Sequence, residues 1–154
     1  MANATLLITG GAGFTGRHLI EAAKQKGYRC IAMVQHEGPE ATTACDTLIA
    51  DLLDPASLEQ AILEVKPDYI VHLAAISFVA HGNTAEIYQV NQLGTINLLD
   101  AIRKNAPEVK KVLIASSANI YGNTAALPIT ESVPSAPVNH YGMSKVTMEL
   151  ATRL

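Results

Sequence analysis

Short apolar runs alternate with longer amphipathic segments along this sequence, and the alternation limits the possible folds more than any other feature. Strands are expected at Thr5–Thr9, Arg29–Val34, Thr47–Ala50, Tyr69–Ala74 and Lys111–Ser116. Helices are expected at Phe14–Lys26, Pro55–Val65 and Thr84–Lys104, and from His140 onward. Strands that are apolar throughout and alternate with helices form a parallel sheet covered on both faces. With right-handed crossovers, the sequence predicts an α/β protein with a doubly wound parallel sheet.

Local signals mark several boundaries. Gly27 closes the first helix, and Asp54 can cap the second, with Pro55 in its first turn. The long helix places one set of mostly apolar residues on one side: Ile87, Val90, Leu93 or Gly94, Leu98 and Ile102. A loop rich in Pro and Ser is expected over 122–139. The last helix reaches Leu154 without a cap, Gly or Pro, so we expect the sequence to be a fragment.

Composition excludes several classes of protein. With 49% apolar and 16% charged residues, the 154-residue chain is too apolar to be disordered and too poor in charge to be a coiled coil. Its net charge of −3 offers no basic surface to nucleic acid or to an anionic membrane. No apolar run reaches the roughly eighteen residues of a membrane span, and two cysteines are too few for a secreted disulfide scaffold. The five histidines lack the spacing of metal ligands, so no metal site is predicted. Because the sequence shows neither a membrane span nor a disulfide framework, the chain is expected to be cytoplasmic.

The first expected strand runs directly into a glycine-rich turn that opens the first helix. Gly10, Gly13 and Gly16 are three residues apart. At such a turn the backbone N–H groups and the helix dipole attract a phosphate, and a side chain at Gly10 or Gly13 would hold it away. Gly16 lets the helix lie close to the strand. The sequence therefore predicts the pyrophosphate-binding turn of a Rossmann fold, formed by Gly10, Gly13, Phe14, Thr15 and Gly16.

Residues after the second and third strands bear on which dinucleotide would bind. NAD sites usually carry an acid at the end of the second strand, where it binds the ribose 2′-hydroxyl. Val34 occupies that place, so no carboxylate there repels the 2′-phosphate of NADP. No Arg is present to bind this phosphate, but Gln35 could donate a hydrogen bond to it. Asp51 and Leu52, after the third strand, are expected beside the adenine. The pattern favours NADP(H) over NAD(H).

Tyr141 and Lys145 are four residues apart at the start of the last helix, so they share a face. A nearby ammonium favours the phenolate form of a tyrosine, which otherwise ionises near a pH of about 10. Ser116 and Ser117 end the fifth expected strand, at the sheet edge where ligands bind in this fold. A tyrosine, a lysine and a serine of this kind can form a proton-transfer site beside a substrate oxygen.

Together these motifs resemble the extended short-chain dehydrogenase/reductases, in the branch that modifies nucleotide sugars. In chain order they are the Gly10–Gly16 turn, His72–Ala75, Asn91 before Gly94-Thr95, Ser116–Gly122 and Tyr141–Lys145. The resemblance covers the whole chain, but members of this family continue well beyond residue 154 into a smaller substrate-binding domain. It implies that residues 1–154 are an NAD(P)-binding Rossmann domain truncated before that second domain.

The resemblance also implies roles for single residues. Tyr141 would be the acid–base, Lys145 its activator and the anchor of the cofactor ribose, and Ser117 the donor to the substrate oxygen. Asn91 matches an asparagine that keeps the structure and a proton-relay water in place. The cofactor would be bound by Asn91 as well and lined by Leu73, Ala74 and Ala75.

Two further expectations concern partners. Ser77 lies past the fourth strand at the ligand edge, where a contact with the sugar of a nucleotide-sugar substrate is expected. Members of the family often dimerise through the long helix and the helix that carries the tyrosine, so the resemblance implies a homodimer.

One substitution narrows the reaction. The sugar 4,6-dehydratases of this family carry an acid two positions after the Ser/Thr, whereas this chain has Ala118 and Asn119, which do not exchange protons at neutral pH. A 4-keto-6-deoxy-hexose reductase that consumes NADPH or NADH and a 4-epimerase that retains its NAD both remain. The segments Ala75–Val79 and Asn91–Leu99 resemble GDP-6-deoxy-4-keto-mannose reductases, which favours the reductase.

Two alternatives involve no turnover. A non-catalytic dinucleotide-binding module could keep the glycines and lose Tyr141 or Lys145, but both are present. An inactive half-enzyme would bind the dinucleotide weakly and turn over nothing, and we expect this of the isolated 154-residue chain.

Overall fold

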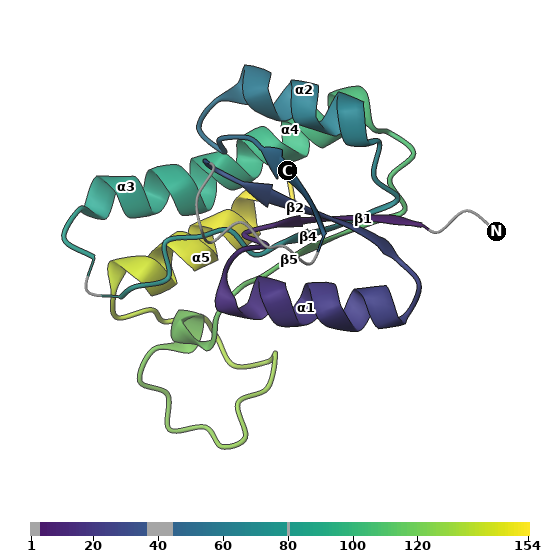
Figure 1. Ribbon diagram of the computed structural model, residues 1–154. Coiled ribbons are helices and arrows are strands. Elements are labelled where there is room, and N and C mark those ends of the chain that lie inside the picture. Colours follow the sequence, from purple (N-terminus) through teal and green to yellow (C-terminus); the bar gives the residue numbers. More distant parts are fainter. Residues whose placement is uncertain (1–3, 37–44, 80) are drawn as a thin grey trace. The chain divides into compact units, whose positions relative to one another are not determined.

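The computed structural model describes residues 4–36, 45–79 and 81–154 (Figure 1). The chain divides into two compact units. The first comprises Met1–Ala74 and Asn97–Ala115, and the second comprises Ala75–Ile96 and Ser116–Leu154. Among the described residues, no helix has both the length and the apolar character that a membrane crossing requires.

The first unit contains a parallel sheet of five strands. They are β1 (Thr5–Thr9), β2 (Arg29–Val34), β3 (Asp46–Ile49), β4 (Tyr69–His72) and β5 (Lys111–Ile114). Their order in the sheet is β3-β2-β1-β4-β5, so the chain winds outward in one direction from β1 and then in the other from β4. This order confirms the predicted doubly wound parallel sheet.

Helices cover both faces of this sheet. They are α1 (Phe14–Gln25) on one face and α2 (Pro55–Val65) and α4 (Gly94–Asn105) on the other (Figure 1). Asp54 caps α2 as predicted, because its Oδ1 accepts hydrogen bonds from the N–H groups of Ala56 and Ser57 at 3.0 and 3.3 Å. Such a cap stabilises a helix by about 1 kcal/mol.

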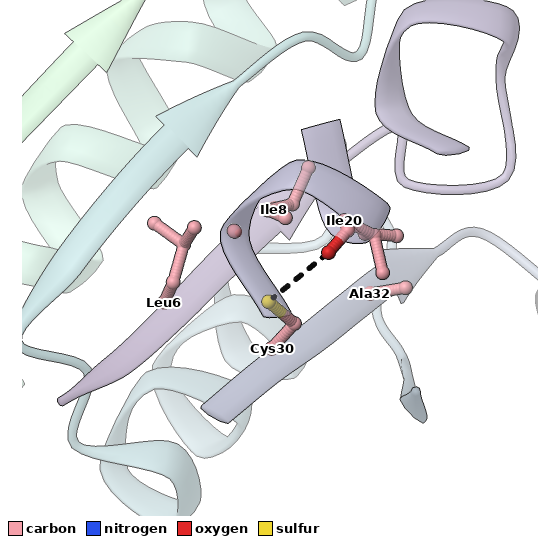
Figure 2. Packing of buried hydrophobic residues seen from close by; sticks show 6 residues of the cluster. Leu6, Ile8, Ile20, Cys30 and Ala32 are labelled. Atoms are coloured by element: carbon pink, nitrogen blue, oxygen red, sulfur yellow. Dashed lines mark hydrogen bonds between the residues drawn. The ribbon is translucent and has the colours of Figure 1, made fainter. Parts of the chain in front are cut away.

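The packing between α1 and the sheet rests on small and branched apolar residues. Ile20 of α1 is fully buried against Ile8 of β1 and Ala32 of β2, and Cys30 lies beside them with its Sγ 3.8 Å from the Ile20 carbonyl (Figure 2). Burying one such side chain contributes about 2 kcal/mol. The close approach of α1 places the start of the helix at the carboxyl end of β1.

Two strands are shorter than predicted. The expected strands Tyr69–Ala74 and Lys111–Ser116 end at His72 and Ile114. The last residue of β1, Thr9, pairs with His72 of β4, and His72 pairs with Ile114 of β5. The strands therefore end together, and the sequence of one strand alone does not show how long its neighbours are. The residues beyond these ends are released from the sheet at its carboxyl edge. β3 is shifted by one residue from the predicted Thr47–Ala50, and α1 ends one residue earlier than predicted.

The second unit is helical and irregular. It contains α3 (Thr84–Tyr88), a π-helical turn η1 (Gln89–Leu93), a 3₁₀ turn η2 (Ala118–Tyr121) and α5 (His140–Ala151), whose start was predicted. The chain is helical from Thr84 to Asn105, close to the helix predicted over Thr84–Lys104, but η1 interrupts the α-helical geometry within this span. A π turn carries one extra residue and rotates the helical residues after it. It buries Asn91, and it leaves Leu93 51% exposed.

Candidate active site

The glycine turn of the first unit begins with a left-handed backbone position that favours glycine. Gly10 has a φ of +68°, which side chains rarely adopt, and a Cβ there would lie 2.8 Å from the backbone nitrogen of Ala74. Thr9 supports this contact, since its hydroxyl accepts the Ala74 N–H at 3.1 Å and lies 2.5 Å from Nδ1 of His72. His72 is 2% exposed, so this contact gives a buried ring a polar partner.

The start of α1 has the form expected of an anion cradle. Gly13 is the N-cap, and no side chain caps the helix. A Cβ at Gly16 would lie 2.5 Å from the Gly10 carbonyl, so close packing requires glycine there, as predicted. A Cβ at Gly13 would meet the Gly10 carbonyl at 3.2 Å and no other described atom within 4 Å. An uncapped helix start behind this open position fits the pyrophosphate of a dinucleotide.

Four more residues complete the turn. Phe14 is 83% exposed and its ring meets that of His18 edge-on, and Thr15 is exposed beside it. Sequence reasoning missed Gly11, where a Cβ would lie 2.6 Å from that of Ala32, and Arg17, whose Nε donates to the Ala12 carbonyl at 2.6 Å. The doubled glycine was a usable signal for Gly11, but the Arg17 contact depends on the folded turn.

The residues predicted for the adenosine side do come together. Gln35 follows β2 and donates from Nε2 to Oδ2 of Asp51, which follows β3, at 3.2 Å. The other Asp51 oxygen accepts the Leu53 N–H at 2.8 Å. Leu52 is buried, and its carbonyl accepts a hydrogen bond from Asn97. A carboxylate therefore lies beside Gln35 even though the end of β2 has none of its own, because the register of β2 and β3 brings it there.

In the second unit, α5 buries the predicted tyrosine and lysine. Asn139 caps the helix by accepting the Gly142 N–H at 2.7 Å. Tyr141 is 9% and Lys145 4% exposed, and the Tyr141 hydroxyl forms no hydrogen bond to a described residue. Burial lowers the pKa of Lys145 from its usual value, and the nearby Glu149 carboxylate opposes that shift.

Ser117 lies at the start of η2 with its hydroxyl oriented by a neighbour. Its Oγ accepts from both the backbone and the side-chain nitrogen of Asn119, each at 3.2 Å. Asn119 in turn accepts from Asn139, the cap of α5, at 3.4 Å. Both roles of Ser117 Oγ are as acceptor, so its hydrogen stays available for donation to a substrate oxygen. The connecting roles of Asn119 and Asn139 were missed, because they depend on contacts between distant segments.

Asn91 connects three segments of the second unit. Its Oδ1 accepts the Ile76 N–H at 2.8 Å, and its Nδ2 donates to the Ile76 carbonyl and to Ser144 Oγ, each at 3.0 Å. Ser144 donates to the Tyr141 carbonyl at 2.7 Å. Both amide hydrogens are thus used within the protein, which fits the structural part of the role expected of Asn91. A direct contact with the cofactor stays a prediction.

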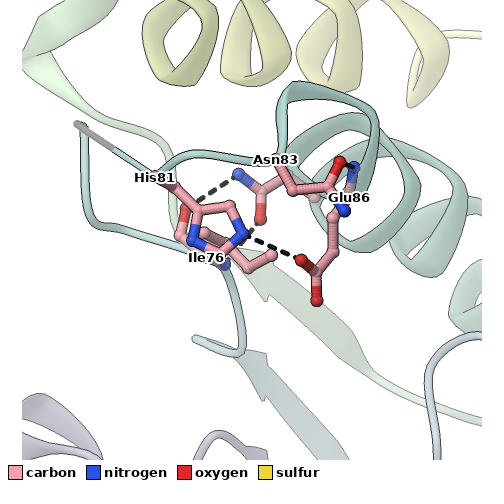
Figure 3. Close-up of polar contacts among 5 residues, drawn as sticks. Ile76, His81, Asn83 and Glu86 are labelled. Atoms are coloured by element: carbon pink, nitrogen blue, oxygen red, sulfur yellow. Dashed lines mark hydrogen bonds and ion pairs between the residues drawn. The ribbon is translucent and has the colours of Figure 1, made fainter.

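The segment after Ala74 is held at both ends. Asn91 holds Ile76, and His81 Nε2 lies 2.8 Å from Oε2 of Glu86, whose backbone nitrogen donates to Asn83 (Figure 3). Ala75 is half-buried, and Ser77 between these anchors is exposed. In the part of the chain that the structure describes, no group of three or more His, Cys, Asp or Glu could hold a metal ion.

Comparisons with known proteins agree on one family. The model of the NAD dependent epimerase/dehydratase family matches residues 6–154. The chain is 40% identical over 94% of its length to a GDP-6-deoxy-D-talose 4-dehydrogenase from Aggregatibacter actinomycetemcomitans, and spans 46% of that protein. It is 31% identical over 94% of its length to a UDP-glucose 4-epimerase from Halalkalibacterium halodurans, and spans 44% of it.

A solved structure is similar in the same way. The crystal structure of UDP-glucose 4-epimerase from Brucella ovis in complex with NAD has a TM-score of 0.88 and 31% identity. The match covers 96% of this chain and 46% of that one, so this chain spans about half the length of the relatives it matches. The chain belongs to the NAD dependent epimerase/dehydratase family.

Proposed function

We propose that this chain carries the cofactor-binding and proton-transfer residues of an enzyme that moves a hydride at C4 of a nucleotide-linked hexose. The observation that carries the proposal is the buried Tyr141–Lys145 pair on α5 of the second unit. The first unit of the same chain contains the glycine turn at the start of α1. Family membership supports the use of a nicotinamide dinucleotide. A non-catalytic module would have no need to bury a lysine against its desolvation cost.

Each residue has a distinct task in this proposal. The bound dinucleotide supplies the hydride donor or acceptor. Tyr141 exchanges a proton with the oxygen on C4, and Lys145 stabilises the phenolate and binds a ribose hydroxyl. Ser117 donates its free hydrogen to the same C4 oxygen, and Ser77 contacts the sugar. The pyrophosphate is held by Gly10, Gly13, Phe14, Thr15 and Gly16, and the adenine by Asp51 and Leu52.

Among the reactions of this family, we favour oxidoreduction of a GDP-linked 6-deoxyhexose. The GDP-6-deoxy-D-talose 4-dehydrogenase is more similar to this chain than the UDP-glucose 4-epimerase from Halalkalibacterium, at 40% against 31% identity over similar shares of the chain. A 4-dehydrogenase and a 4-keto reductase perform the same step in opposite directions. The alternative is a 4-epimerase that retains its NAD, which several relatives of the same family support by name.

Two observations bear in opposite directions on whether the chain prefers NAD(H) or NADP(H). The absence of an acid at the end of β2 favours NADP(H), whereas the Asp51 carboxylate beside Gln35 would repel a 2′-phosphate. We give the carboxylate more weight, because a charge acts over a longer distance than an amide. We therefore propose that the chain binds NAD(H) more tightly, and that Asp51→Asn narrows the difference.

The test uses the complete gene product with GDP-4-keto-6-deoxymannose and either NADPH or NADH. The reductase consumes the dinucleotide, measured as loss of absorbance at 340 nm, and forms a 6-deoxyhexose. Interconversion of UDP-glucose and UDP-galactose without net loss of absorbance would support the epimerase instead. No turnover with either substrate, together with tight dinucleotide binding, would contradict the enzyme proposal and support the non-catalytic module.

Three properties stay predictions. We expect the isolated 154-residue chain to bind dinucleotide without turnover, as an incomplete NAD(P)-binding domain would. A homodimer and a cytoplasmic location are expected from the resemblance and the composition. Calorimetric titration of this chain with NADH and NADPH, and its mass in solution by light scattering, test the first two.

A further inference from the structure

A carboxylate on α5 contacts the segment that carries Ser117. The hydroxyl of Ser116, the residue before Ser117, donates a short hydrogen bond to Oε1 of Glu149. Both residues belong to the second unit. The bond therefore ties the chain just before Ser117 to the helix that carries Tyr141 and Lys145.

The same carboxylate acts on the buried lysine. Glu149 follows Lys145 by four residues, so the two lie on one face of α5. Burial disfavours the charged form of Lys145 and lowers its pKa, and the charge of Glu149 acts in the opposite direction. Lys145 must be cationic to stabilise a phenolate, so the carboxylate supports the form that the proposed chemistry needs.

In the part of the chain that the structure describes, the elements that pack closely against α5 carry two tyrosines and one carboxylate. They are α3, η1 and η2. The turn η1 has no titratable residue, η2 has Tyr121, and α3 has Tyr88 and Glu86. Glu86 is engaged by His81, and Tyr88 shares a hydrogen bond with His140.

We propose that Glu149 is a positioning residue with two functions: one oxygen fixes the Ser116–Ser117 segment to α5, and the negative charge, four residues from Lys145 on the same face, favours the ammonium form of that lysine. The significance of this coupling rests on the proposed function, but the coupling itself does not require turnover.

Two substitutions separate the two functions. Glu149→Gln keeps an oxygen that can accept from Ser116 but removes the charge, so the pKa of Lys145 should fall. Ser116→Ala keeps the charge but removes the hydrogen bond, so the Lys145 pKa should stay unchanged while the Asn119 and Ile120 amides exchange with solvent several-fold faster. Glu64→Gln, an exposed acid on α2 of the other unit, is the control and should change neither quantity.

The measurement is ¹³C NMR titration of labelled lysine Cε, with Lys145 assigned by Lys145→Arg, together with amide hydrogen exchange. A Lys145 pKa that is equal in the wild type and Glu149→Gln would overturn the charge function. Unchanged exchange in Ser116→Ala would overturn the tether. If the proposed function fails and no nucleotide sugar is turned over, the lower Lys145 pKa in Glu149→Gln and the faster amide exchange in Ser116→Ala are still expected. If turnover is present, the basic limb of the kcat profile should move to lower pH in Glu149→Gln, because Lys145 then loses its proton at lower pH, while KM stays constant.

Discussion

The two candidate sites of this chain are built by different means. The glycine turn of the first unit is made of backbone. Gly10 must be glycine because of its positive φ, Gly16 must be glycine because of close packing, and no side chain caps the start of α1. The site on α5 is made of buried side chains that polar residues from other segments hold, as Asn91 does through Ser144. The backbone site should therefore fail through added volume, and the side-chain site through a lost functional group.

The largest effect expected from this comparison is at the side-chain site. Tyr141→Phe keeps the ring and removes the acid–base, so kcat of the complete gene product should fall by about 10³-fold. Dinucleotide affinity, measured by calorimetry, should stay nearly constant, because the cradle of the first unit is unchanged. Tyr28→Phe serves as the control with normal turnover, and full activity in Tyr141→Phe would remove this residue from the mechanism.

The second effect concerns the stability of the backbone site. Gly10→Ala combines a positive φ with a Cβ 2.8 Å from the Ala74 nitrogen, so the free energy of unfolding should fall by about 3 kcal/mol. Gly27→Ala has a φ of +84° but nothing within 4 Å, and should cost about 1 kcal/mol. Urea denaturation of both variants checks this, and equal losses would show that the contact with Ala74 adds nothing.

A smaller effect separates dinucleotide binding by the glycine turn from the stability of the fold. Gly13 has an extended backbone with a φ of −71°, which alanine also adopts, so Gly13→Ala should change stability by less than about 1 kcal/mol. Its methyl group would fill the open position before α1, so the affinity for NADH should fall about tenfold or more. Gly82→Ala, where the added Cβ meets nothing within 4 Å, is the control. Unchanged affinity in Gly13→Ala would place the pyrophosphate elsewhere.

The smallest effect follows from the titration of Lys145. Its folded pKa lies below the usual 10.5, so between these two values the unfolded state binds more protons than the folded state. The free energy of unfolding should therefore rise with pH through this window, and Lys145→Met should lack this part of the rise. Denaturation of both proteins over a pH series measures the difference, and parallel curves would contradict the buried, desolvated lysine.

The sequence predicted the sheet because its strands are short apolar runs whose buried character is local. It could not predict where β4 ends, since that depends on the length of β1 beside it. Nor could it predict η1, because Gln89–Leu93 contains no Gly or Pro and the single Gly94 that follows does not by itself mark a π turn. Asn91 is buried there by contacts with Ile76 and Ser144, which lie far from it in the sequence.

The candidate site divides in the same way. The glycines and the Tyr141–Lys145 spacing are local patterns, so the sequence could single out these residues, and their binding and catalytic roles stay predictions. The Gln35–Asp51 contact and the Ser116–Glu149 bond join residues 16 and 33 positions apart. Such contacts depend on strand register and helix placement, so the spacing of residue types along the chain does not reveal them.

The most direct test of the central claim is to follow the hydride itself. The complete gene product is incubated with GDP-4-keto-6-deoxymannose and NADH or NADPH that carries deuterium at C4 of the nicotinamide. Both hydrogens at that carbon are replaced by deuterium, so the transferred hydride is labelled whichever face it leaves. We predict that the sugar product carries one deuterium, and that NMR places it at C4. A product without deuterium, or with deuterium at another carbon, would contradict hydride transfer at C4 by this protein.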